Sequence, residues 1–154
     1  MMKKQAFTLL ELIIVIIIVG VLATLGYAAY SSTIEKFRGA EAKQVLGQMR
    51  STAIGYHMQQ GGSFPSDLDE LQKVFGIGEG TDQIPLRCRS SNYFRYWATF
   101  TDGDLTLMAT RCGSSASDDG GKLPRYPDPT PPSVTWVLDD EGTIINDLTE
   151  PPYK

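Results

Sequence analysis

The sequence has few of the residues from which catalytic and metal-binding sites are built. It contains a single histidine, His57, and two cysteines, Cys88 and Cys112. No Ser/His/Asp set, Cys/His pair, phosphate-binding loop or pair of carboxylates stands out at a spacing that catalysis uses. We therefore predict that the chain is not an enzyme, and we expect no cofactor and no metal ion.

The sequence also lacks a cluster of basic residues. Lysines and arginines number 14 against 18 aspartates and glutamates, and the formal net charge is -4. Proteins that bind nucleic acid rely largely on a concentrated positive surface that neutralises phosphates. The composition therefore gives no support to a nucleic-acid partner.

Polar side chains are missing altogether from residues 12–23, the middle of a long apolar run. The run covers residues 7–25 and carries one charge, Glu11. As a helix it would span roughly 28 Å, which is close to the ~30 Å thickness of a bilayer's hydrocarbon core. We predict a membrane-spanning helix over residues 7–30.

Two lysines, Lys3 and Lys4, precede this run. Positive residues usually remain on the cytoplasmic side of a membrane. We therefore expect a single-pass protein of the inner (cytoplasmic) membrane, with its N-terminus inside and everything after Tyr30 outside.

Glu11 is unusual within such a helix. An ionised carboxylate in hydrocarbon costs about 2.5–3.5 kcal/mol on insertion scales and usually has a partner or a purpose. No lysine or arginine lies within a helical turn of it. A very short leader, residues 1–6, also ends where the apolar run begins, so the bond between Ala6 and Phe7 is a candidate processing point.

These residues, KKQAFTLLE at positions 3–11, resemble the N-terminal signature of the type IV pilin family. The family includes pilus subunits and the pseudopilins of type II secretion, and the resemblance covers about the first thirty residues. It implies that a prepilin peptidase cleaves between Ala6 and Phe7 and that the new Phe7 amine is methylated. The family usually has Gly before the cut; Ala6 is also small, so we expect cleavage, at a rate that the alanine could lower.

The resemblance also implies a role for Glu11 in assembly. Cleavage would place an ammonium group one helical turn before Glu11, at the positive end of the helix dipole. In a helical filament of identical subunits, Glu11 of an incoming subunit would pair with the Phe7 amine of a neighbour and fix the axial register. The implied partners are other copies of the chain, the prepilin peptidase, an inner-membrane assembly platform and the membrane itself.

The sequence leaves three functions open. The first is a type IV pilin that ends in a cell-surface pilus, and the second is a pseudopilin of a periplasmic type II secretion pseudopilus. The third is a plain membrane-anchored or secreted binding domain, since residues 26–28, GYA, also offer the small residues that a signal peptidase uses. In that last case Glu11 would have no role.

After Tyr30 the pattern becomes amphipathic without a helix breaker, and residues 31–60 are predicted to continue the same helix to about Gln60. Gly20 and Gly26 mark points where the first half could melt locally. The expected apolar stripe of the second half recurs mostly at intervals of three and four residues: Ile34, Phe37, Ala42, Val45, Met49, Ala53 and Tyr56.

Residues 61–154 are predicted to form one globular head. We expect a short helix capped by Ser66 and Asp69, a loop over residues 78–92, and strands over residues 93–100, 105–112, 133–138 and 143–146, followed by a loose tail from residue 149. The predicted fold class is therefore α+β and pilin-like, with a long helix packed on a small antiparallel sheet.

The two cysteines, Cys88 and Cys112, are predicted to form a disulfide, because the head would face an oxidising compartment. A hairpin turning at residues 102–103 would put Cys112 opposite Tyr93, so the bond requires the loop before Tyr93 to curl back. Closing this loop would contribute roughly 3 kcal/mol. Two free thiols or a metal pair are the alternatives, but supporting ligands are missing.

Turn carboxylates are the remaining candidates for a site. Calcium could bind Asp102 and Asp104, or the group Asp139, Asp140 and Glu141. Neither turn has the spacing of a known calcium motif, and solvated carboxylates are the preferred interpretation.

Overall fold

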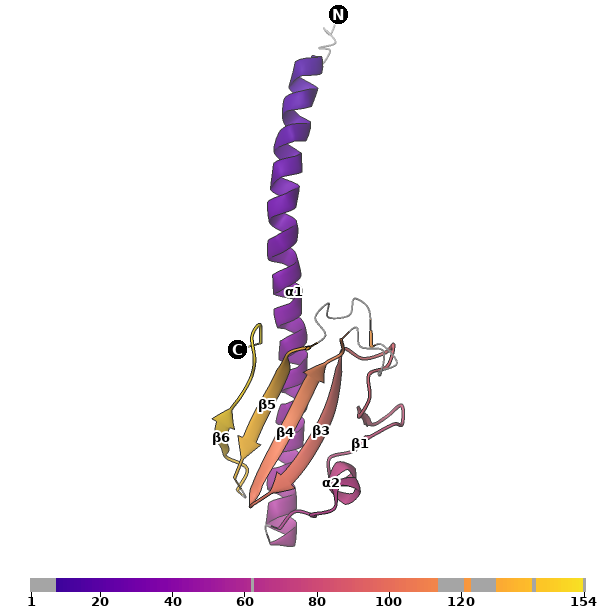
Figure 1. Ribbon diagram of the computed structural model, residues 1–154, viewed down its shortest axis with the longest axis vertical. Coiled ribbons are helices and arrows are strands. Elements are labelled where there is room, and N and C mark those ends of the chain that lie inside the picture. Colours follow the sequence, from indigo (N-terminus) through magenta and orange to yellow (C-terminus); the bar gives the residue numbers. More distant parts are fainter. Residues whose placement is uncertain (1–7, 62, 114–120, 123–129, 140, 154) are drawn as a thin grey trace, which may run out of the picture. The chain divides into compact units, whose positions relative to one another are not determined.

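The structure, a computed structural model, describes residues 8–61, 63–113, 121–122, 130–139 and 141–153, without the side chain of residue 28. The chain forms two compact units, Met1–Glu35 and Lys36–Lys154. One helix, α1 (Leu9–Gln60), runs through the boundary between them (Figure 1). The helix is continuous at Gly20 and Gly26, and it ends where the sequence predicted.

Gly61 provides the stop signal of α1. Its φ of 74° lies in the left-handed region that glycine adopts without strain, and its N–H donates to the carbonyl of His57 at 3.1 Å. The chain then enters a short helix, α2 (Leu68–Val74). Asp67, and not Ser66 as expected, caps α2, because its carboxylate accepts the N–H of Glu70 at 3.0 Å.

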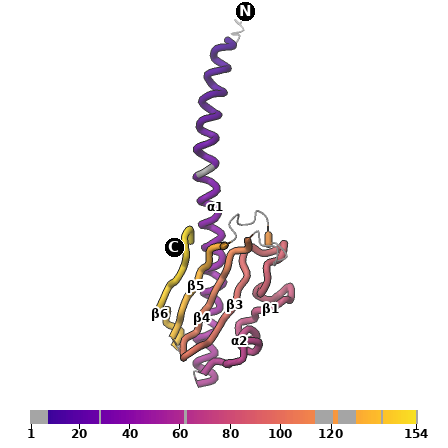
Figure 2. The backbone as a smooth tube through the Cα atoms, in the orientation of Figure 1, coloured from indigo at the N-terminus to yellow at the C-terminus, as the bar shows by residue number. Residues whose placement is uncertain are grey.

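The second unit contains a four-stranded antiparallel sheet in the order β3-β4-β5-β6 (Figures 1 and 2). Its strands are β3 (Phe94–Thr101), β4 (Asp104–Arg111), β5 (Ser133–Leu138) and β6 (Ile144–Asp147). Asp102 and Gly103 join β3 to β4 with positive φ at both positions, as a two-residue hairpin turn requires. The predicted fold class is confirmed: a long N-terminal helix is followed by a small antiparallel sheet.

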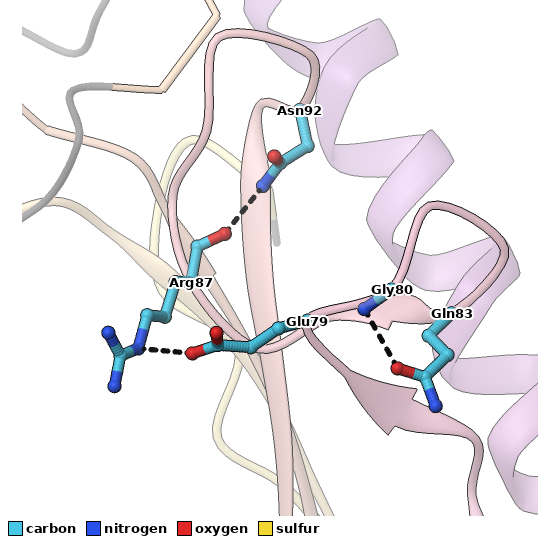
Figure 3. A network of polar contacts seen from close by, with 5 residues as sticks. All are labelled: Glu79, Gly80, Gln83, Arg87 and Asn92. Carbon is cyan, nitrogen blue, oxygen red and sulfur yellow. Dashed lines mark hydrogen bonds and ion pairs between the residues drawn. The ribbon is translucent and has the colours of Figure 1, made fainter.

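Two short strands lie at the start of, and within, the stretch of residues 78–92 that was predicted to be a loop. They are β1 (Ile77–Gly78) and β2 (Ile84–Pro85), which pair in parallel. Their pairing rests on backbone bonds from the N–H of Ile84 to Gly76 and from that of Leu86 to Gly78, at 2.9 and 3.2 Å. The Gln83 side chain accepts the N–H of Gly80 and closes the turn between them (Figure 3).

The core of the second unit lies between α1 and the inner face of the sheet. Alternate positions of β3 and β4 point inward, and α1 contributes Ala42, Leu46, Met49 and Ala53, all at most 1% exposed. Phe37 was expected on this stripe but is 69% exposed. Five residues before Ala42, it lies roughly 140° around the helix from the buried face.

The C-terminal segment is packed, so the expectation of a loose tail was wrong. Tyr153 is 5% exposed, its ring lies 5.6 Å from that of Phe94, and its carbonyl accepts a bond from Lys43 Nζ at 2.6 Å. The N–H of Glu150 also donates to the carbonyl of Ser133 at 2.9 Å and prolongs the sheet. The segment therefore belongs to the core of the unit.

A buried glycine makes room for this segment. A Cβ atom on Gly39 would overlap the ring of Tyr153, whereas a Cβ atom on Gly47 would meet nothing within 4 Å. Both glycines lie in α1, so the same substitution has opposite consequences at the two positions.

We predict that Gly39→Ala lowers the free energy of unfolding by about 1–3 kcal/mol, because it overpacks the contact with Tyr153. Gly47→Ala, the matched control, should raise it by about 0.5–1 kcal/mol through helix propensity. Urea unfolding of the full chain in detergent micelles, followed by far-UV circular dichroism, measures both. Equal effects of the two substitutions would contradict this packing.

Cys88 and Cys112 form a disulfide with their Cα atoms 5.6 Å apart. Cys112 lies opposite Tyr93, and its N–H donates to the Tyr93 carbonyl at 2.8 Å. The loop before Tyr93 curls back because the Asn92 amide donates to the carbonyl of Arg87 at 3.2 Å (Figure 3). The same amide also donates to the carbonyl of Phe94 at 2.6 Å. Asn92 therefore shapes the loop that brings Cys88 to the end of β4.

We predict that the double variant Cys88→Ser, Cys112→Ser loses about 3 kcal/mol of unfolding free energy, since its unfolded chain is no longer cross-linked. The same urea titration measures the loss. Wild-type protein unfolded in the presence of dithiothreitol is the matched comparison and should behave like the variant. If reduction and substitution both leave the midpoint unchanged, the disulfide does not stabilise the head.

Candidate functional site

The candidate site is the first turn of α1, which contains Glu11. Thr8 precedes the helix, and its hydroxyl accepts the N–H of Glu11 at 3.3 Å while its carbonyl accepts that of Leu12 at 3.2 Å. Thr8 is thus the N-cap, and Glu11 occupies the third helical position. A carboxylate there interacts favourably with the positive end of the helix dipole.

The capping role of Thr8 was not predicted from the sequence. The signal was present, because T-x-x-E before an apolar run, here residues 8–11, is the sequence signature of a capping box. Within the described residues no lysine or arginine forms an ion pair with Glu11. The Glu11 side chain therefore lies in the first turn of α1 and has no cationic partner among the described residues.

The helix that follows Glu11 presents apolar side chains in every direction. The large apolar residues between Leu9 and Leu25 are all exposed, from 41% for Ile13 to 76% for Leu9. By length and composition, α1 can cross a membrane in this part. A surface of this kind requires lipid or other apolar helices around it.

Polar groups along this part of α1 are compatible with such surroundings. The hydroxyl of Thr24 donates to the carbonyl of Val21 at 2.8 Å, so it needs no outside partner. Tyr27 and Tyr30, 76% and 66% exposed, follow the apolar run. Tyrosines are enriched at membrane–water interfaces, where an apolar ring and a polar hydroxyl are both accommodated.

The residues of the predicted processing point lie outside the described part of the chain. These are Ala6 and Phe7, together with Lys3 and Lys4 of the leader. Cleavage between Ala6 and Phe7 and methylation of Phe7 stay predictions. Of the predicted site residues, the structure describes Glu11 and the joined pair Cys88 and Cys112.

The single histidine and one of the turn carboxylates have structural roles. His57 is partly buried in the last turn of α1, and its carbonyl takes part in the helix stop. Asp139 holds its turn, because its carboxylate accepts the N–H of Thr143 at 2.7 Å. Throughout the described ranges, no three His, Cys, Asp or Glu side chains come together as a metal site.

Tyr96 is the one described group with a clear pKa shift. Burial in the core, and to a smaller extent the negative charge of Glu41, raise the pKa of its phenol. Tyr96 therefore stays protonated at physiological pH and acts as a core residue.

Comparison with known proteins gives a match at the same end of the chain as the candidate site. Residues 1–27 match the family model of the prokaryotic N-terminal methylation motif. No curated protein and no solved structure gives a significant match to the chain. The motif points to a structural subunit rather than an enzyme, and to a membrane-anchored precursor. The first 27 residues thus carry the prepilin-type signature of type IV pilins and pseudopilins.

Proposed function

We propose that the chain is a structural filament subunit, a type IV pilin that is processed before Phe7 and assembled through its N-terminal helix. The observation that carries the proposal is the motif at residues 1–27, which contains an apolar helix surface that no described part of the chain covers. In the precursor, lipid surrounds this apolar surface. In a filament, the helices of neighbouring subunits replace the lipid.

In this proposal, Glu11 fixes the axial register between the helices of neighbouring subunits. Apolar side chains alone would let one helix slide along another at little cost, because many positions bury a similar area. A carboxylate among them has to meet a cation, and a buried charge that loses its partner costs about 3–5 kcal/mol. The methylated amine of Phe7 in a neighbouring subunit is that cation, so one axial position is strongly preferred.

The remaining parts of the chain follow from this scheme. Residues 1–6 are the leader, residues 7–30 the membrane and filament-core segment, residues 31–60 the amphipathic half of the helix, and residues 61–154 the head. The leader stays in the cytoplasm, where a prepilin peptidase removes it, and the head lies outside the membrane. An inner-membrane assembly platform extracts the processed subunit.

A pseudopilin of a type II secretion system is the second candidate, because the same motif and helix serve a short periplasmic filament. Deletion of the gene separates the two functions. Loss of long surface fibres identifies a pilin, whereas loss of protein export in cells without such fibres identifies a pseudopilin. Deletion of a gene for a plain membrane-anchored domain would cause neither defect.

We predict that Glu11→Ala enters the membrane and is cleaved, but that its yield of sheared filaments falls at least about tenfold, since about 3–5 kcal/mol of pairing is at stake. Electron microscopy and immunoblotting of the sheared fraction measure the yield. Glu41→Ala, which removes an exposed carboxylate further along α1, should assemble normally.

A second substitution separates charge from helix capping at this position. Glutamine also serves at the third position of a capping box, so Glu11→Gln keeps the cap and removes the charge. We expect the same assembly defect from Glu11→Gln as from Glu11→Ala. Regular filaments from Glu11→Gln would show that the cap, and not the charge, is what assembly requires.

A further inference from the structure

Strand β6 is the last strand of the sheet. In the part of the chain that the structure describes, it pairs with β5 alone, so its other side is a free edge (Figure 1). All four of its residues are exposed, and Ile145 and the following Leu148 are each 54% exposed. A free edge with apolar side chains is a template for pairing with another strand, above all with the same edge of a second copy.

The backbone groups that such a strand would meet are those of residues 147, 149 and 151. The N–H groups of Leu148 and Glu150 both donate to carbonyls of β5, at 2.9 Å. Backbone groups of successive residues in a paired strand point to opposite sides. Residues 147, 149 and 151 therefore turn their backbone groups away from β5, towards the free edge.

Two of these three positions have no N–H group to offer to another strand. The Asp147 carboxylate accepts the N–H of Thr149 at 3.0 Å, and the Thr149 hydroxyl donates to the same oxygen. Pro151 has no N–H group at all. Of the three outward-facing N–H groups that a strand could have met, only that of Asp147 is left.

A bulge interrupts the edge on the other side of Asp147. Val137 pairs with Asn146, but the next residue, Leu138, pairs with Ile144. Ile145 is thus one residue too many for a regular ladder. A bulge bends an edge strand and breaks the row of groups to which another strand would bind.

The opposite edge of the sheet, on β3, is also closed by side chains. The amide of Gln72 donates to the carbonyl of Ala98 at 2.6 Å and accepts the N–H of the same residue at 3.4 Å. Four residues earlier, the carbonyl of Phe94 accepts the Asn92 amide at 2.6 Å. Side chains thus take the place of a neighbouring strand at both ends of the sheet.

We propose that Asp147 closes the free edge of the head, so that the β6 edges of two copies of the chain do not pair. Without its carboxylate, residues 147 and 149 of one copy would oppose residues 149 and 147 of the other, and the two Leu148 side chains would face each other. The proposal goes beyond filament assembly and does not depend on processing at Phe7, because all of its residues lie in the head.

The test is sedimentation velocity of the full chain in detergent micelles over a range of protein concentrations. Asp147→Val should associate at a concentration at least about tenfold below that of the wild type, because each copy regains the N–H of Thr149 and loses a charge at the edge. Asp82→Val, the matched control, makes the same change in the exposed turn between β1 and β2 and should behave like the wild type.

A third variant separates the hydrogen bond from the charge. Asp147→Asn keeps a side-chain oxygen that can accept the N–H of Thr149, and asparagine serves as well as aspartate in bonds of this kind. We expect Asp147→Asn to associate no more than the wild type. Association as strong as that of Asp147→Val would show that the charge, and not the bond, protects the edge, and would overturn the proposal.

Two measurements assign the association to the edge. Backbone hydrogen exchange of peptides that cover residues 144–149 should slow down when Asp147→Val associates. Adding Leu148→Lys should abolish the association, because it places two like charges opposite each other. Unchanged thermal unfolding midpoints would show that these variants keep their fold.

Four further outcomes would overturn the proposal. They are association of Asp147→Val no stronger than that of the wild type, equal association of Asp82→Val, association that leaves hydrogen exchange at residues 144–149 unchanged, and association that Leu148→Lys does not reverse.

Discussion

The uncovered apolar surface between Leu9 and Leu25 is the constraint on which the rest of this protein depends. Nothing in the described chain shields it, and its side chains point to all sides of α1. The only charge along it, Glu11, lies at the end of the helix, where the cap from Thr8 and the helix dipole favour a carboxylate. This apolar surface must therefore be covered by other molecules. In our proposal these are first lipids and then the helices of neighbouring subunits.

The same helix serves a second purpose after Lys36. Its buried side chains, such as Leu46 and Met49, form one wall of the core, and the sheet forms the other. So small a core needs further ties, which the disulfide and the C-terminal segment over Gly39 provide. The disulfide joins the loop before β3 to the end of β4, and Tyr153 of the C-terminal segment packs on α1.

The elements that could be predicted carry their signals in neighbouring residues. The end of α1 at Gly61, the turn at Asp102 and Gly103 and the position of β5 all follow from local chemistry. The sequence did not reveal β1 and β2, because strands of two residues have no periodicity, nor the packing of Tyr153, because its contact with Gly39 joins residues far apart. The place of Glu11 in the first turn of α1 could be predicted from the sequence, whereas its role in assembly stays a prediction.

In the proposed function, the N-terminus is cut and modified before the helix enters a filament. Mass spectrometry of the N-terminal peptide, from membranes and from a sheared surface fraction, tests it most directly. We expect a peptide that begins at Phe7 and carries one added methyl group. A peptide that begins at Met1, or one that begins near Ala29, would contradict it and would leave an anchored or secreted domain in place of a filament subunit.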